Sequence, residues 1–309
     1  MDARVHRLPT RDGVELCLER HAPGIASSQS LCLAHGFGQT RMAWQRSAAL
    51  LAASGYEVIS ADARGHGDSG RNGPGQRYDF RQFVDDVSIV AAQAAHPRPV
   101  WVGASMGGLL GLMASTDADG PAFSALVLVD ITPRWSDDGV ARILDFMRGN
   151  PDGFASLDEA ADAVVSYLPQ RPRKSAERLR SLLREGADGR LRWHWDPRLL
   201  DELDVDGNGW SSQLEDATRR LDLPTLLISG GRSDLVGDEQ VEHFLELAPH
   251  AMHVRLPTAT HMVVGDENDA FTRAVLDFLP TVGSPAGQSH GASSLGGHRR
   301  DAPISGVPR

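Results

Sequence analysis

The amino-acid sequence predicts an α/β fold, in which helices cover both faces of a mainly parallel β-sheet. The first observation is a series of short apolar runs that recur along the 309 residues. The second is that helix-like stretches lie between most of these runs, an alternation typical of parallel sheets. The third is a composition of 41% hydrophobic and 23% charged residues, which is that of a soluble globular protein with a substantial core.

The expected strands and helices follow one another in a regular order. Two strands open the chain, around 4–8 and 14–20, and the turn residues Arg11-Asp12-Gly13 join them. The remaining strands are expected at 31–35, 57–62, 99–104, 125–130, 225–230 and 252–257, with helices at 41–54, 79–95, 109–115, 238–248 and 267–279.

The spacing of strands breaks between Asp130 and Thr225. Three segments of this interval, "GVARILDFMR", "SLDEAADAVVSYL" and "SAERLRSLLRE", carry apolar residues near a period of 3.6. We interpret 134–220 as a helical cap inserted into a core made of 1–133 and 221–280; an ordinary pair of crossover helices is the alternative. Residues 281–309 are rich in Gly, Ser, Pro and Ala and are expected to form a disordered tail.

Charge and composition exclude several functional classes. The net charge is −10 and the basic residues are scattered, which disfavours nucleic acid as a partner. The first twenty residues lack the apolar centre of a signal peptide, and no run approaches the ~18 apolar residues of a membrane span. We therefore expect a cytoplasmic protein that does not bind a membrane, and we leave the formation of a homo-oligomer open.

The two cysteines and the single lysine indicate little chemistry of their own. Cys17 and Cys32 lie in strand-like apolar runs without any Cys/His spacing of a metal site, so we expect two buried structural thiols and no metal. Lys174, the one lysine, lies in the polar stretch "RPRKSAERLR", where Schiff-base chemistry is not expected.

The stretch "PVWVGASMGGLLGLMAS" at 99–115 carries the most specific motif. It places Ser105 between a predicted strand and a predicted helix, within a Gly-x-Ser-x-Gly pattern. Such a turn exposes the serine hydroxyl and needs small neighbours, because it brings the strand and the helix close together. Ser105 is thus a candidate nucleophile; an unreactive serine in a glycine-rich loop is the alternative.

A serine hydroxyl becomes a nucleophile when a base takes its proton and a carboxylate orients that base. His261 in "LPTATHMVVGD" follows the strand at 252–257 and precedes a helix, so it is the candidate base. Asp234, which follows the strand at 225–230 and its glycine turn, is the preferred acid. Asp130 at the end of the strand at 125–130 is the alternative acid.

An oxyanion formed at the attacked carbonyl needs backbone donors. One is expected from Met106, the residue after the nucleophile, and a second from the loop that follows an earlier strand. "LCLAHGFGQT" provides that loop, with Phe37 as the expected donor. His35 is expected to shape this loop rather than to titrate.

Together these motifs resemble the α/β-hydrolase superfamily. The matching segments are His35-Gly36-Phe37-Gly38, "DARGHGDSG" (62–70), Gly103–Gly108, "GGRSDLV" (230–236) and "THMVVGDENDAF" (260–271). The resemblance covers about 1–280. It implies an eight-stranded sheet with the second strand antiparallel, a helical cap over the carboxyl edge of the sheet, and no cofactor.

The identity of the nucleophile narrows the reaction. Epoxide hydrolases and haloalkane dehalogenases of this superfamily carry an aspartate where this chain has Ser105. We therefore expect a serine hydrolase acting on a small to medium carboxylic ester or lactone. The alternatives are a carbon–carbon bond hydrolase, a cofactor-free perhydrolase of the non-haem peroxidase type, or a hydrolase-like protein that binds a ligand without turnover.

The substrate pocket is expected to be apolar, because four of the six tryptophans lie within 134–220. The candidate pocket residues are Gly36, Trp135, Trp193, Trp195 and Met262. The loop "DARGHGDSG" is expected to brace the neighbouring loops rather than to bind a metal or phosphate.

Overall fold

A computed structural model describes residues 3–24, 29–168, 176–202, 210–266 and 268–282 of the chain. Its centre is an eight-stranded sheet with the order β1-β2-β4-β3-β5-β6-β9-β10. β1 and β2 form an antiparallel hairpin, β2 is also antiparallel to β4, and the remaining pairs are parallel, which confirms the predicted fold class. The strands are β1 (Ala3–Pro9), β2 (Glu15–His21), β3 (Ser30–Ala34), β4 (Glu57–Ala61), β5 (Val100–Ala104), β6 (Ala125–Val129), β9 (Thr225–Gly230) and β10 (Met252–Leu256).

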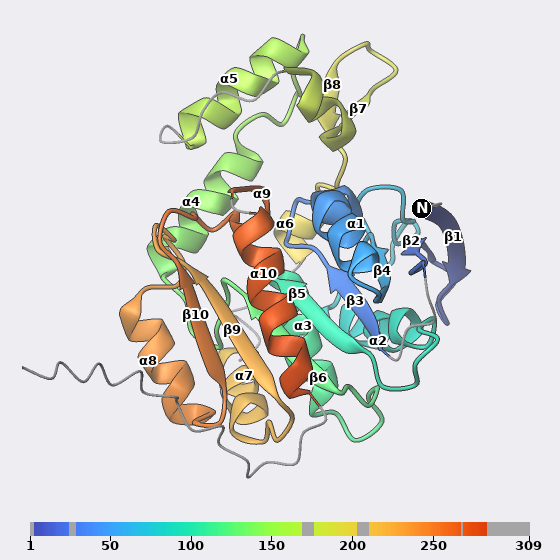
Figure 1. Ribbon diagram of the computed structural model, residues 1–309. Coiled ribbons are helices and arrows are strands. Elements are labelled where there is room, and N and C mark those ends of the chain that lie inside the picture. Colours follow the sequence, from blue (N-terminus) through green and yellow to red (C-terminus); the bar gives the residue numbers. More distant parts are fainter. Residues whose placement is uncertain (1–2, 25–28, 169–175, 203–209, 267, 283–309) are drawn as a thin grey trace, which may run out of the picture.

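Helices cover both faces of the sheet (Figure 1). On one face α1 (Gln45–Ala53) and α10 (Asn268–Phe278) pack against each other and share a buried apolar cluster with the sheet. The opposite face carries α2 (Phe80–Ala91), α3 (Met106–Ser115), α7 (Trp210–Arg219) and α8 (Asp238–Leu247). The short elements η1 (Arg41–Trp44), α9 (Val263–Asp266) and η3 (Leu279–Thr281) complete the core.

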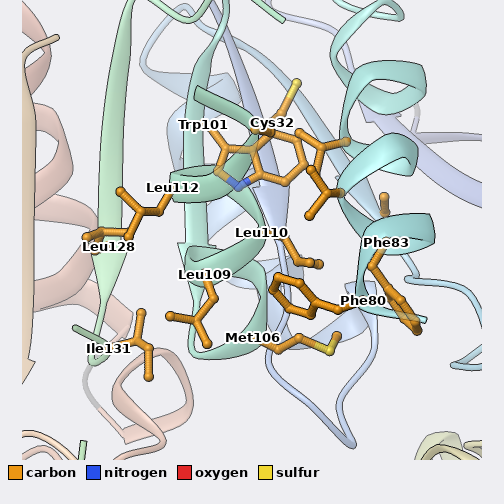
Figure 2. Packing of buried hydrophobic residues seen from close by; sticks show 14 of the residues in the cluster. Cys32, Phe80, Phe83, Trp101, Met106, Leu109, Leu110, Leu112, Leu128 and Ile131 are labelled. Atoms are coloured by element: carbon orange, nitrogen blue, oxygen red, sulfur yellow. The ribbon is translucent and has the colours of Figure 1, made fainter. Parts of the chain in front are cut away.

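α3 is packed unusually close to the sheet. Its glycine-rich first turn lets the indole of Trp101 on β5 lie against the helix and donate to the carbonyl oxygen of Gly107 at 2.9 Å. A Cβ on Gly111 would lie 2.1 Å from that indole, so only glycine fits there. Figure 2 shows Leu109, Leu110 and Leu112 of this helix with Phe80 and Phe83 of α2 in the same apolar cluster. The close approach fixes where the turn before α3 must lie.

The interval predicted as a cap contains more than helices. It begins with α4 (Asp137–Arg148) and α5 (Leu157–Tyr167), continues through η2 (Ala176–Leu182), and then forms a hairpin of β7 (Leu183–Glu185) and β8 (Leu191–Trp193) before α6 (Leu199–Glu202). The hairpin was not expected, because "LRE" and "LRW" are too short to display a strand period. α4, α5 and the hairpin extend away from the sheet in Figure 1. α7, at the end of the interval, contacts α3 and α8 of the core.

The structure also bears on the predictions for the cysteines, for membrane-spanning helices and for the C-terminal segment. Cys17 and Cys32 are both unpaired and buried, as predicted, and burial raises the pKa of the Cys32 thiol to about 12. Within the described residues, none of the helices has the length and apolar character to cross a membrane. The tail predicted at 281–309 lies outside the described residues from 283 onward.

The close contact between α3 and the sheet predicts a large effect of a small substitution. A Cβ on Gly107 would lie 2.5 Å from the carbonyl oxygen of Ala34 on β3. We expect Gly107→Ala to lower the free energy of unfolding by about 3 kcal/mol, since backbone must move to relieve the overlap. Urea unfolding measures this. Gly24→Ala, where no atom lies within 4 Å of the new Cβ, is the control and should change stability by less than about 0.5 kcal/mol.

Candidate active site

Ser105 lies on the turn between β5 and α3, with φ at 46° and ψ at −119°. A positive φ is rare for a residue other than glycine and costs about 1–3 kcal/mol. Two contacts hold the turn in place. The Ser105 N–H donates to the carbonyl oxygen of Val129 on β6 at 3.0 Å, and a Cβ on Gly103 would overlap Gly107. The strand and the helix are therefore packed too closely at this turn for a side chain at position 103.

His261 lies in the loop between β10 and α9, and its Nδ1 is 2.7 Å from Oδ2 of Asp130. Asp130 directly follows β6, has φ at 50° and is fully buried. Its carboxylate also accepts hydrogen bonds from the backbone N–H of Gly230 at 2.7 Å and from the hydroxyl of Ser233. A buried carboxylate requires such donors. The loop after β9 thus holds the acid, and the acid holds the imidazole.

Asp130, and not the preferred acid Asp234, is the carboxylate hydrogen-bonded to His261. Asp234 forms an ion pair with Arg142 of α4 at 2.8 Å, and its side chain is 30% exposed. The contact to His261 is made by Asp130, the alternative acid, with Nδ1 on the carboxylate. Both acids follow neighbouring strands at the same edge of the sheet, so the sequence placed either of them near the histidine. The left-handed backbone of Asp130 turns its side chain toward His261.

The predicted oxyanion loop adjoins Ser105. A Cβ on Gly36 would lie 3.2 Å from the Cβ of Ser105, which places the loop after β3 in contact with the nucleophile. A turn follows, in which Gln39 N–H donates to the Gly36 carbonyl oxygen and Gly38 has a φ of 75°. Met106 is the first residue of α3, where backbone N–H groups lack partners within the helix. Phe37 and Met106 therefore flank Ser105 as candidate donors.

Three buried histidines hold this loop. His66 Nε2 accepts from the Gly38 N–H at 3.2 Å, and His194 Nε2 lies 3.2 Å from the Gly38 carbonyl oxygen. His194 Nδ1 accepts from the Gly67 N–H at 2.8 Å. Nε2 of His35 accepts a hydrogen bond from the Ala63 N–H at 3.0 Å, which links the loop after β3 to the loop after β4. The sequence motif predicts a loop-shaping role for His35 but not for His66 or His194.

These histidines are held in the neutral form. Burial lowers the pKa of His35, places that of His66 well below the usual value, and lowers that of His194 to about 3. Each ring accepts from a backbone N–H through one nitrogen and can donate through the other, which requires the uncharged imidazole. A proton on the acceptor nitrogen would break the hydrogen bond from the Ala63 N–H to His35, from the Gly38 N–H to His66, or from the Gly67 N–H to His194.

The loop "DARGHGDSG" carries buried ion pairs. Arg64 is 2% exposed and contacts Asp86 and Asp12, each at 2.7 Å. Asp62 is fully buried and accepts from the backbone N–H of Arg41 at 2.6 Å and from its guanidinium. These contacts tie the loop to the turn between β1 and β2, to α2 and to η1, in agreement with a bracing role.

Two cavities meet at Ser105, and Phe37 and Ile143 border both of them. We name the first the cap cavity; it has a volume of about 160 Å³ and is bordered by His261, Met262 and side chains of α4, α5 and β8. We name the second the α4 cavity; it has a volume of about 450 Å³ and lies between α2, α3, α4 and α6. Both are lined mainly by apolar side chains.

All five candidate pocket residues border these cavities. Gly36, Trp193, Trp195 and Met262 line the cap cavity, and Trp135 lines the α4 cavity. The rings of Trp193 and Trp195 stack 5.1 Å apart, and Phe146 of α4 stacks on Tyr167 of α5 at 4.3 Å. These pairs form part of the wall of the cap cavity. Residues of α5 and α6 that line the cavities were not foreseen, because their amphipathic pattern equally fits a helix packed on the core.

Comparison with known proteins agrees with this geometry. A family model described as the alpha/beta hydrolase fold matches residues 29–268. The chain therefore belongs to the alpha/beta hydrolase fold family, a family of hydrolases.

Two relatives and one solved structure illustrate the likeness. The chain is 27% identical over 248 residues to a 3-hydroxybutyrate-oligomer hydrolase from Cupriavidus necator, an alignment that covers 76% of this chain and 83% of the relative. It is 28% identical to a non-heme chloroperoxidase from Kitasatospora aureofaciens, covering 87% and 98%. The crystal structure of E-2-(acetamidomethylene)succinate hydrolase superposes with a TM-score of 0.76 at 20% identity, over 90% of this chain and 100% of the other. That last likeness concerns the fold alone.

The histidine contacts predict a dependence of stability on pH. His194 binds a proton in the unfolded chain near its ordinary pKa of 6.5 but only near pH 3 in the folded protein. The contribution of neutral His194 to the free energy of unfolding is therefore complete above pH 6.5. It is lost as the pH falls toward 3, at up to about 1.4 kcal/mol per pH unit. We expect His194→Gln, whose amide can both donate and accept, to lose less stability than wild type between pH 6.5 and 4.5. Denaturant unfolding across this range measures it.

The matched control is His6→Gln, which removes an exposed histidine from β1. If the two variants show the same loss of stability with pH, His194 does not titrate on unfolding and the neutral contacts are not required.

Proposed function

We propose that the protein is a serine hydrolase that cleaves small to medium carboxylic esters or lactones through an acyl-enzyme on Ser105. The observation that carries the proposal is the hydrogen bond between Nδ1 of His261 and Oδ2 of Asp130, 2.7 Å long. His261 and Ser105 border the same apolar cavity. A buried carboxylate joined to an imidazole, together with a strained serine that borders the same cavity as that imidazole, is the arrangement used in acyl transfer.

Each residue has one role in the proposed reaction. Asp130 accepts the Nδ1 proton of His261 in a hydrogen bond, which leaves Nε2 free to take the proton of Ser105. The Ser105 oxygen attacks the carbonyl carbon, and the backbone N–H groups of Phe37 and Met106 stabilise the oxyanion. His261 then donates the proton to the departing alcohol, and a water molecule deprotonated by His261 releases the acid.

The named relatives support an ester as substrate. The printed name of the Cupriavidus relative describes the hydrolysis of hydroxybutyrate oligomers. A more distant relative from Mus musculus, 25% identical over 83% of this chain, is named a diacylglycerol lipase. Apolar lining on both sides of Ser105 fits ester groups better than charged substrates.

A peroxide-dependent reaction is a second candidate, favoured by the similarity to the non-heme chloroperoxidase. It would use the same acyl-enzyme, with hydrogen peroxide in place of water as the group that attacks it and a peracid as product. Turnover of one ester with and without added peroxide, with separate detection of acid and peracid, distinguishes the two.

The nucleophile can be tested by covalent labelling. We expect a fluorophosphonate to form a stoichiometric adduct at Ser105, because an activated serine oxygen displaces fluoride from phosphorus. Intact mass and peptide mapping locate the adduct. Ser105→Ala should take no label and lose nearly all esterase activity while it unfolds at a similar denaturant concentration. Full activity in this variant would exclude the mechanism.

The identity of the acid can be tested with two asparagine variants. Asp130→Asn replaces the acceptor for His261 Nδ1 and should lower kcat by roughly 10³–10⁴-fold, since the imidazole then loses its tautomer and its charge stabilisation. Asp234→Asn removes only a partly exposed ion pair and should stay within about threefold of wild type. Steady-state kinetics on one activated ester measures both. The reverse order of effects would restore Asp234 as the acid.

A further inference from the structure

The two cavities at Ser105 differ in their access to the proposed base. His261 borders the cap cavity, together with Met262 and the side chains of α5. The α4 cavity is bordered by Met106, Ile131 and Leu109, and among its described lining residues there is no histidine. Ser105 and Phe37 border both. A carbonyl group bound at Ser105 therefore has one side toward His261 and the other side away from it.

Proton transfer assigns a part of the substrate to each side. When the tetrahedral intermediate breaks, the bond between the carbonyl carbon and the alcohol oxygen is cleaved, and that oxygen takes the proton held by His261. The alcohol oxygen must therefore be within reach of the imidazole. The acyl chain, which remains on Ser105, must extend where it does not block His261 from the incoming water.

We propose that the cap cavity binds the alcohol portion of the ester and the α4 cavity binds the acyl chain. This assignment rests on the proposed function. The water that cleaves the acyl-enzyme enters through the cap cavity after the alcohol has left, gives one proton to His261 and bonds to the carbonyl carbon. Ser105 leaves with that proton. Deacylation thus depends on the α4 cavity and is independent of the alcohol.

The lining of each cavity sets the chemical class of each portion. The α4 cavity, about 450 Å³, is walled by aromatic and aliphatic side chains that include Phe80, Phe83 and Leu144, and its charged lining residues are Arg148 and Asp201. The cap cavity, about 160 Å³, has no acidic side chain, lysine or arginine among its described lining residues. The substrate class is therefore an ester of an extended apolar acid with a compact uncharged alcohol.

The chain provides a matched pair of positions for a test. Val140 of α4 borders the α4 cavity but not the cap cavity, and Val165 of α5 borders the cap cavity but not the α4 cavity. Both valines are partly exposed and lie on helices outside the proposed catalytic residues. Val140→Phe and Val165→Phe insert the same added volume into one cavity each, and Val140→Ala and Val165→Ala enlarge the same sites.

Two ester series separate the portions of the substrate. In the first, the p-nitrophenyl group is constant and the acyl chain runs from acetyl to decanoyl; in the second, the acyl group is butanoyl and the alcohol runs from methanol to hexanol. We expect Val140→Phe to lower kcat/KM at least tenfold for the long acyl chains and to leave the order of preference among alcohols unchanged. Val165→Phe should lower kcat/KM at least tenfold for the larger alcohols only. Effects of this size correspond to the loss of one or two methylene contacts.

Pre-steady-state kinetics gives an independent readout. After the burst of p-nitrophenol, the deacylation rate of the octanoyl enzyme should fall by more than about twofold in Val140→Phe. It should stay within about twofold of wild type in Val165→Phe, because a cap cavity too narrow for a larger alcohol still admits a water molecule. Each alanine variant should extend the range of the portion that its phenylalanine counterpart restricts, which excludes a general defect in folding. Equal fluorophosphonate labelling of all variants confirms that Ser105 stays activated.

The possible results distinguish this assignment from the proposed function. If Val140→Phe restricts the alcohol and Val165→Phe restricts the acyl chain, the assignment is reversed. If each variant restricts both series equally, the cavities do not bind separate portions. In either case wild-type ester turnover leaves the proposed function intact. If wild type neither turns over esters nor takes the label, the proposed function fails and the assignment fails with it.

Discussion

The structure of the site depends on how closely α3 approaches the sheet. The first turn of the helix lies so close to β5 and β3 that no Cβ fits at Gly103 or Gly107. Of the three residues between these two glycines, Ser105 is the one with a positive φ. The same approach directs the free N–H groups of the helix start toward the serine. The cost of the strained backbone is offset by the apolar contacts that α3 makes with β5 and α2.

Much of this arrangement could be predicted from the sequence. The eight strands of the main sheet appear within one or two residues of the expected positions, because each is a short apolar run between turn residues. Ser105, His261 and the loop at Gly36 were identified by their places after strands, and the parallel sheet brings the ends of these strands to one edge. Elements with little period, such as the hairpin of β7 and β8, could not be predicted, because their pairing depends on tertiary contacts such as the bridge between Phe154 and Leu191.

The choice between Asp130 and Asp234 shows where sequence reasoning ends. Both acids follow strands of the central sheet, and both lie within reach of the edge where His261 is found. What separates them is the backbone torsion of Asp130 and the presence of Arg142 beside Asp234. Arg142 is distant in sequence and lies on α4, so neither motif nor spacing reveals that it pairs with Asp234. The hydroxyl of Ser233, next to Asp234 in the chain, instead supports the other acid.

The backbone of Gly38 is held on both sides, by His66 from the core and by His194 from the segment that follows β8. A displacement of the segment after β8 would break the second contact and leave the backbone of Gly38 held by His66 alone. The geometry of the oxyanion loop is therefore coupled to the position of the segment that carries His194. The same segment carries the stacked pair Trp193 and Trp195, so the contact that fixes the oxyanion loop also fixes part of the wall of the cap cavity.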